Sequence, residues 1–155
     1  MKYIFISIII LNLSSCGNDL IKWEKYNQSS EITKNSKIEN KKLRYKRIQS
    51  ISLDKNNLIN AYENEISSFL KSKYDKLKPF IIEKSIPEIQ QYIIDGKFNY
   101  YDLSLFYISR IYLVEFNQKT YLNSIISLNE NILKEARKKD EIGNENIYSI
   151  FGIPI

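Results

Sequence analysis

The sequence predicts a mainly α-helical chain that includes the beginning of an α/β unit. Three observations lead to this expectation. The 155 residues and 43% hydrophobic content suit one globular domain. Apolar side chains recur at three- and four-residue spacing, which is typical of helices with one buried face. Helix-capping residues stand at Asp54, Ser85, Asn99 and Asn129. We therefore expect helices to dominate, with short strands near the C-terminal end.

The first fifteen residues are predicted to be an export signal. Lys2 precedes a nearly continuous apolar run over residues 3–13. This run is too short for a membrane-spanning helix, which needs about 20 residues to cross a core of about 30 Å. A basic residue followed by a short apolar run is typical of a signal peptide.

Cys16, the one cysteine of the chain, is a predicted lipidation site. The run ends in Leu13-Ser14-Ser15-Cys16, which resembles the bacterial lipobox that is cleaved before an acylated cysteine. We expect a lipoprotein anchored in a lipid bilayer through acylated Cys16, on the periplasmic or cell-surface side. Two or three acyl chains give firmer anchoring than one. A plain secretory signal with an incidental cysteine, or a buried N-terminal strand, remains the alternative.

Residues 16–57 are predicted to form a basic polar tether. Residues 16–50 hold nine Lys/Arg and four Asp/Glu, or +5, whereas residues 51–155 hold thirteen and fourteen, or −1. A solvated linker is the preferred interpretation, and attraction to anionic lipid headgroups is the alternative. Nucleic acid is not an expected partner, because the basic block lacks interleaved aromatic residues. The basic residues concerned are Lys41, Lys42, Arg44, Lys46 and Arg47.

The composition excludes several kinds of chemistry. The chain has no histidine, which removes Ser-His-Asp and Cys-His catalysis and histidine-containing zinc sites. One cysteine permits no internal disulfide and no CxxC site. We expect no cofactor and no metal site. Any catalysis would have to use Ser, Lys, Tyr or carboxylates.

The first predicted helix of the domain covers residues 55–77. Asp54 is its expected N-cap and Pro79 its expected end. The apolar face is predicted to pack on the core, and it consists of Leu58, Ala61, Tyr62, Ile66, Phe69 and Leu77.

Two further helices follow in quick succession. Ser85, with Pro87 in the first turn and Glu88 as the third helical residue, forms a capping box, and Gly96 suits a left-handed terminator. Asn99 then caps a helix that runs to about Phe116. Apolar residues surround most of this helix, so we expect it to be buried between layers.

The C-terminal part is predicted to alternate between strand and helix. Residues 121–128 suit a short strand, and Asn129 caps a helix that ends with Arg137, Lys138 and Lys139 near its negative end. Residues 140–146 form a loop. Residues 147–155 are apolar, with a glycine and a proline that argue against helix, and are expected to begin a second strand. This order suggests the edge of an α/β unit.

Four stretches of the chain, in the same order as in the family, resemble sequence motifs of the amidase signature family. Its "Leu-x-x-x-Tyr-x-x-Arg-Ile" helix matches residues 103–111, and its "Leu-Asn-Ala-Ile-Ile-x-Leu-Asn-Pro" motif matches residues 122–130, with Ser124 for Ala and Glu130 for Pro. "Glu-Ala-Arg-x-x-Asp" corresponds to residues 135–140 and "Leu-x-Gly-Ile-Pro-Ile" to residues 150–155. With the preceding helix that ends in Gly, the resemblance covers residues 85–155.

The resemblance implies the N-terminal helices and first edge strands of an α/β/α amidase fold, over residues 58–155. The family hydrolyses carboxamide bonds with a Ser-cisSer-Lys triad, whose residues follow its Gly-Ile-Pro-Ile motif. No residue of this chain matches them, so we assign no catalytic residue here. The expected function is an incomplete, inactive N-terminal fragment of an exported amidase, which would act on an amide substrate only if the missing part were supplied.

Two other interpretations remain open. The chain can be a free-standing helical lipoprotein with a structural or binding role. It can also be a cytosolic amidotransferase subunit that handles charged tRNA, although the export leader argues against this. Solubility with cooperative melting favours the free-standing domain, whereas aggregation through exposed apolar segments favours the fragment.

Overall fold

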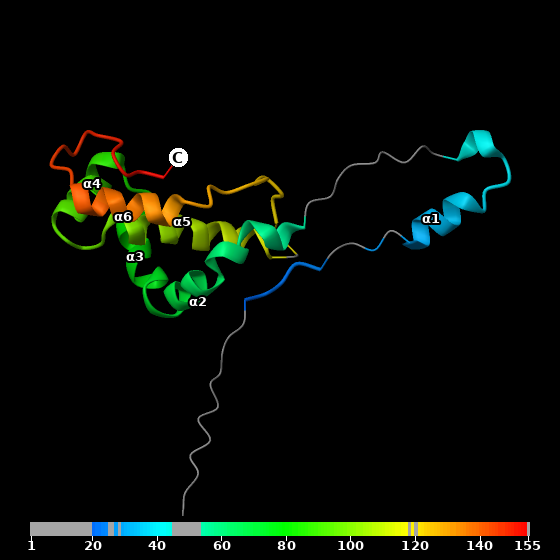
Figure 1. Ribbon diagram of the computed structural model, residues 1–155, viewed down its shortest axis with the longest axis horizontal. Coiled ribbons are helices and arrows are strands. Elements are labelled where there is room, and N and C mark those ends of the chain that lie inside the picture. Colours follow the sequence, from blue (N-terminus) through cyan, green and yellow to red (C-terminus); the bar gives the residue numbers. More distant parts are fainter. Residues whose placement is uncertain are drawn as a thin grey trace, which may run out of the picture.

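The computed structural model describes residues 20–24, 27, 29–44, 54–117, 119 and 121–154. It is mainly α-helical, as expected, and the described residues contain no strand. Figure 1 shows a helical body of α2 to α6, with α1 apart from it. In chain order the elements are α1 (Ser29–Ser36), η1 (Lys41–Leu43), η2 (Lys55–Leu58), η3 (Asn60–Tyr62), α2 (Glu63–Ser72), α3 (Tyr74–Ile81), α4 (Ile86–Ile94), α5 (Tyr100–Glu115) and α6 (Ile132–Ile142).

Helix α5 is the centre of the body. It packs against α2, α3 and α6, and ten of its sixteen residues are buried. Leu103 and Phe106 are fully buried at 0% exposure, and both belong to the main hydrophobic core. The prediction of a helix buried on most sides is confirmed, because apolar side chains around the whole circumference need neighbours on every side.

The local signals around α4 and the start of α5 are also confirmed. The Glu88 carboxylate accepts bonds from the backbone N–H of Ser85 at 2.8 Å and from its hydroxyl at 2.7 Å, within a capping box. Gly96 has a φ of 71°, and the next N–H, from Lys97, reaches back to the Tyr92 carbonyl. This is the Schellman ending that glycine favours. The Asn99 side chain caps α5.

The single helix predicted over residues 55–77 is wrong. Two short 3₁₀ segments, η2 and η3, lead into α2. Helix α2 then ends before Lys73, and a separate helix, α3, begins after it. The helical spacing of apolar residues survives these breaks, because 3₁₀ turns and α turns both return a side chain to one face after about three or four residues. Tyr62, Ile66 and Phe69 are accordingly buried.

Pro79 does not end a helix; α3 continues through it to Ile81. Proline lacks the N–H for one helical bond. The turn is retained because the Ile82 N–H still bonds the Lys78 carbonyl at 3.0 Å, and because Ile81 is buried at 2% exposure. Apolar burial here outweighs one missing hydrogen bond.

The predicted strand over residues 121–128 is not formed. The N–H groups of Asn123 and Ser124 bond the Glu115 carboxylate instead of a neighbouring strand, and Asn123 adopts a positive φ of 52°. A strand also needs a second strand as partner, and the described residues offer none.

Residues 147–154 likewise form turns and not the predicted beginning of a strand. Gly152 has a φ of 70°, a conformation that bends the chain and that glycine adopts readily. A Cβ at this position would lie 2.4 Å from a ring carbon of Tyr100, so the backbone passes directly over that ring.

Helix α6 begins and ends later than the sequence suggests. Asn129 starts the preceding turn, where its side chain accepts from the Asn131 N–H at 2.9 Å, and α6 itself begins at Ile132. The helix runs to Ile142, so Asp140 is helical and not part of a loop. This extension places Asp140 beside the start of α5, as described below.

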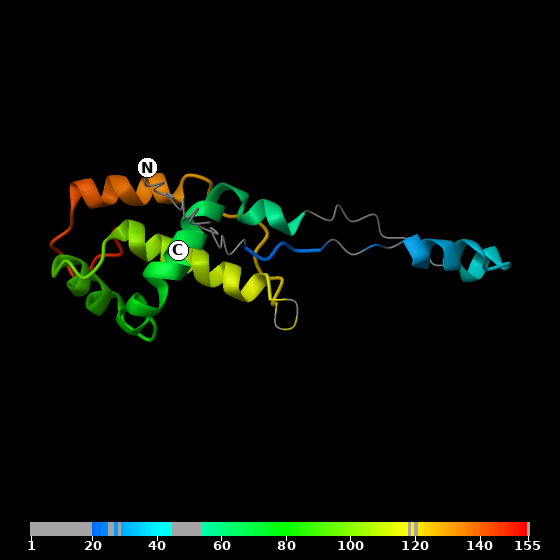
Figure 2. The ribbon, with the colours of Figure 1, turned by 90° about the horizontal axis from the view of Figure 1, so that it is seen from below.

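The two ends of the body carry different segments. Figures 1 and 2 both place residues 20–24 beside the C-terminal end of α5, and α4 at the other end of the body. Residues 147–154 lie near α4 and the beginning of α5, where the α4 residue Gln90 holds them. Helix α5 therefore connects two regions in which irregular segments are fastened by buried polar groups.

Candidate functional site

The predicted lipidation site, Cys16, lies outside the described residues, and so do Lys46 and Arg47. Of the basic tether residues, Lys41 and Lys42 belong to η1, and both are exposed. Arg44 donates from Nε to the Ile38 carbonyl at 2.7 Å. The positive charge of this part of the tether thus stays accessible at the surface.

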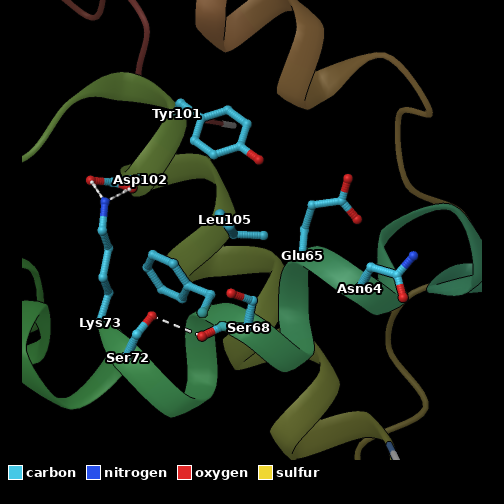
Figure 3. A pocket seen from close by; sticks show the side chains of 9 residues that line it. Asn64, Glu65, Ser68, Ser72, Lys73, Tyr101, Asp102 and Leu105 are labelled. Atoms are coloured by element: carbon cyan, nitrogen blue, oxygen red, sulfur yellow. Dashed lines mark hydrogen bonds and ion pairs between the residues drawn. The ribbon is translucent and has the colours of Figure 1, made fainter.

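A hollow of about 370 Å³ opens between α2 and α5. In Figure 3, Lys73 and Asp102 lie on one side of it, Glu65 lies on the other, and Tyr101 projects above. The nine lining residues are Asn64, Glu65, Ser68, Phe69, Ser72, Lys73, Tyr101, Asp102 and Leu105. Serine, lysine and carboxylate thus meet in one place, which makes this hollow a candidate active site.

The hydrogen bonds in the hollow are structural in kind. The Lys73 ammonium donates to both oxygens of Asp102, at 2.9 and 2.8 Å. The Ser72 hydroxyl donates to the Ser68 carbonyl, a bond internal to α2. A serine nucleophile needs a hydrogen bond to a base, and no such bond joins a serine to Lys73 among these lining residues. The Lys73–Asp102 ion pair instead connects the junction between α2 and α3 to helix α5.

Among the charged groups of the described residues, Glu115 is the most buried; it is the last residue of α5, and its side chain is 2% exposed. Its carboxylate lies 2.8 Å from the ammonium of Lys55, which is itself only 8% exposed. It also accepts from the Asn123 N–H at 3.0 Å, and from the Ser124 N–H and hydroxyl at 2.9 and 2.8 Å. One carboxylate therefore fastens both η2 and residues 123–124 to α5.

These contacts set the protonation of Glu115. Burial alone raises the pKa of a carboxyl group, because it penalises the charged form. The hydrogen bonds from Lys55 and Ser124, with the positive charge of Lys55, outweigh burial and lower the pKa of Glu115 to about 2. Glu115 is thus ionised over the physiological range and is a structural anion, not a proton donor.

Two aromatic rings complete the surroundings of Lys55. Its ammonium lies 4.4 Å from the Trp23 ring centroid and 4.8 Å from that of Tyr121. The two rings meet edge to face, with centroids 4.8 Å apart. Cation–π contact offsets part of the cost of removing a lysine from water. The cluster brings together residues from the tether, η2, α5 and the loop after it.

At the opposite end of α5, neutral groups hold the second irregular segment. Buried Gln90 donates from Nε2 to the carbonyls of Ser149 and Phe151, each at 2.8 Å. Its Oε1 accepts from the Tyr100 hydroxyl at 2.7 Å. The Tyr100 ring lies directly against the backbone of Gly152. Gln90 and Tyr100 therefore fix the position of residues 149–152.

Asp140 adds a second cap to the start of α5. Its carboxylate oxygens accept from the N–H groups of Tyr100 at 2.7 Å and Tyr101 at 3.1 Å. A carboxylate at a helix N-terminus also interacts favourably with the helix dipole. Asp140 and Tyr100 are forty positions apart in the chain, which explains why local capping rules gave no indication of this contact. Gln90 and Glu115 were missed for the same reason, although an amide or a carboxylate among apolar helix positions is a usable signal of buried polar contacts.

The described residues contain no group of histidine, cysteine and acidic side chains that could hold a metal ion. Within the same residues, the helices are too short or too polar to cross a bilayer. No protein-family model, curated protein or solved structure matches this chain.

Proposed function

We propose that the chain is the N-terminal helical part of an exported, membrane-anchored amidase domain. The catalytic lysine and serines of the amidase signature family have no counterpart among its residues. In this proposal, α4, α5 and α6 form a supporting layer, and Cys16 carries the lipid anchor. The chain alone has no amidase activity, and no residue of the hollow between α2 and α5 is assigned a catalytic role.

The proposal rests on how two apolar segments are held and on how much of their apolar surface is exposed. Residues 121–128 and 147–154 are fastened at fixed points by Glu115 and Gln90, yet four of their large apolar side chains are more than half exposed, while others, such as Leu128 and Ile153, pack against the core. The exposed fractions are 71% for Leu122, 78% for Ile126, 79% for Tyr148 and 61% for Ile150. Large exposed apolar patches mark contacts with protein, membrane or ligand, and the proposal assigns these segments a contact with further polypeptide. In this account, that polypeptide carries the catalytic groups.

Release of ammonia from simple carboxamides tests the proposal. The purified chain is expected to give no more ammonia than a buffer blank. Release above the blank that survives further purification would refute the assignment. Lys73→Gln serves as the control, because a real activity in the hollow would require that lysine.

Labelling with a fatty acid tests the anchor separately. The gene is expressed in a bacterium supplied with labelled fatty acid, beside Cys16→Ser. Label on the wild type and loss of label from the variant are expected. Equal label on the wild type and the variant, or no label on the wild type, would contradict acylation at Cys16.

A free-standing helical lipoprotein is the second candidate, and the core of the body favours it. Fifteen buried apolar residues form one cluster that runs from Ile59 to Leu133 and includes all the helices from α2 to α6. A domain with one such core is expected to melt cooperatively. A soluble chain with a single cooperative transition supports this candidate, whereas aggregation that depends on Leu122 and Ile126 supports the amidase fragment.

A further inference from the structure

Residues 20–24, here called the strap, are attached to the body by specific bonds. The Ile21 N–H donates to the Tyr112 hydroxyl at 2.7 Å. The Trp23 N–H donates to Asn56 Oδ1 at 2.8 Å, and Asn56 Nδ2 donates back to the Trp23 carbonyl at 3.0 Å. This reciprocal pair uses an amide side chain in place of a neighbouring strand. Residues 20–24 of the predicted tether are therefore fixed on the body.

The side chains of the strap add two further attachments. The Trp23 ring packs against the buried Lys55 ammonium and the Tyr121 ring. Lys22 forms an ion pair with Glu63 at the start of α2. Because Lys55 is also held by Glu115, removal of Trp23 would expose one side of a buried charge cluster. Side chains as well as backbone groups thus attach the strap to the body.

The strap begins four residues after Cys16. Four residues at full extension span about 14 Å, at about 3.5 Å per residue. An acyl anchor at Cys16 would consequently hold the strap within about 14 Å of the bilayer surface. The position of the body relative to the membrane is then set by the strap, and not by the whole of residues 16–57.

The surface beside the strap is suited to lipid. A hollow there is lined by Ile21, Tyr112, Leu113, Phe116, Asn117 and Lys119. Ile21 is 63% exposed and Leu113 is 42% exposed, while Lys119 stands exposed at its border. Exposed apolar side chains with a lysine at their edge suit the boundary between acyl chains and headgroups, where the lysine stem lies along apolar surface and its charge stays in water.

We propose that Ile21 and Leu113 form a membrane-contact face, which the strap presents to the bilayer. This inference rests on the proposed acylation of Cys16 and adds to it a fixed orientation of the body. Figures 1 and 2 place α4 at the far end of the body from this face. Helix α5 alone separates the two ends by about 24 Å, from 16 residues at about 1.5 Å each. The segment at 147–154 therefore faces away from the membrane.

Photo-crosslinking of the full chain in bacterial membranes tests the proposal. A benzophenone amino acid is placed at Leu113 or, as the matched control, at Ile94 in α4. The two side chains are almost equally exposed, at 42% and 44%. Phospholipid adducts are measured by mass spectrometry, and labelled fatty acid reports on Cys16 in the same samples. About tenfold more adduct is expected at 113 than at 94, because only the first position lies within reach of the anchor.

The outcomes separate the orientation from the anchor. Fatty-acid label with adduct mainly at 113 supports both. Label with equal adduct at the two positions, or with adduct to a protein in place of phospholipid, overturns the membrane-contact face and leaves the anchor standing. Absence of label overturns both.

A strap variant completes the test. Trp23→Ala with the crosslinker at 113 is expected to keep the fatty-acid label and its helical circular dichroism, while its adduct falls to the level measured at 94. Undiminished adduct in this variant would show that the strap does not set the orientation, and would overturn the proposal. Trp23→Phe keeps an aromatic ring over Lys55, so it is expected to retain most of the adduct.

Discussion

The two ends of helix α5 are stabilised in different ways. At its beginning, Asp102 and Asp140 place negative charge where the helix dipole favours it. At its end, Glu115 places negative charge where the dipole opposes it, and yet Glu115 is the more buried group, at 2% exposure against 12% for Asp102. The Lys55 ammonium and three hydrogen bonds offset the cost of burying the Glu115 charge at this end of the helix. We infer that this end depends more strongly on charge and on pH.

The largest effect is expected from Glu115→Gln. Glutamine leaves the buried Lys55 without its counter-charge, and breaking a buried ion pair costs about 3 to 5 kcal/mol. Thermal or urea unfolding at pH 7 measures the loss. Asp102→Asn at the other end is the matched control. Its partner Lys73 is 54% exposed, so that change is expected to cost under about 1 kcal/mol.

A double variant sharpens this result. Lys55→Met with Glu115→Leu removes both charges and is expected to be more stable than Glu115→Gln alone, because no unpaired buried charge remains. Equal or greater destabilisation of the double variant would mean that the bonds to residues 123–124, and not the ion pair, dominate this end of α5.

The second effect is a dependence on pH in the acid range. Glu115 has a pKa of about 2 in the folded protein and an ordinary value of 4.5. A lowered folded pKa contributes stability that is complete above about pH 4.5 and is lost as the pH falls towards 2. This gap corresponds to roughly 3 kcal/mol, at about 1.4 kcal/mol per pH unit. Urea unfolding at several pH values measures it, and Glu115→Gln should lack this part of the slope.

At the beginning of α5, Gln90→Leu is expected to cost about 2 kcal/mol. The variant leaves the carbonyls of Ser149 and Phe151 and the Tyr100 hydroxyl without their partner. No ionised group is removed, so the loss should be the same at pH 4 and pH 7. A loss that changed with pH would contradict the inference that neutral groups hold residues 149–151.

A smaller effect than that of Gln90→Leu is expected from Asp140→Ala, at about 1 kcal/mol. The change removes one of two caps on α5, while the Asn99 cap remains. Hydrogen exchange should show faster exchange at the Tyr100 and Tyr101 amides and little change in residues 121–124. An equal effect at both ends would mean that the helix ends are not independent.

The parts of this fold that the sequence predicted are those set by neighbouring residues. The Ser85–Glu88 box, the Gly96 ending and the Asn99 cap each depend on residues within about six positions. The full burial of α5 followed from its apolar circumference. These features need no knowledge of how distant segments meet.

The parts that were wrong or missed depend on distant contacts. The strand prediction at 121–128 failed because Glu115 takes the backbone N–H groups that a strand would use. Pro79 was expected to end a helix, but burial of Ile81 keeps the turn in place. The pairing of Lys55 with Glu115 joins residues sixty positions apart. Polarity marks such residues as unusual in a core, but it does not identify their partners.

Sequencing of the DNA immediately downstream of codon 155 tests the amidase assignment. We expect a reading frame, in phase or shifted, that encodes a lysine within a few residues of Ile155 and then a Gly/Ser-rich stretch. Such a continuation would supply the catalytic groups that the exposed segments of the body are proposed to meet. Downstream DNA that encodes neither feature in any frame would contradict the amidase assignment and favour the free-standing helical lipoprotein.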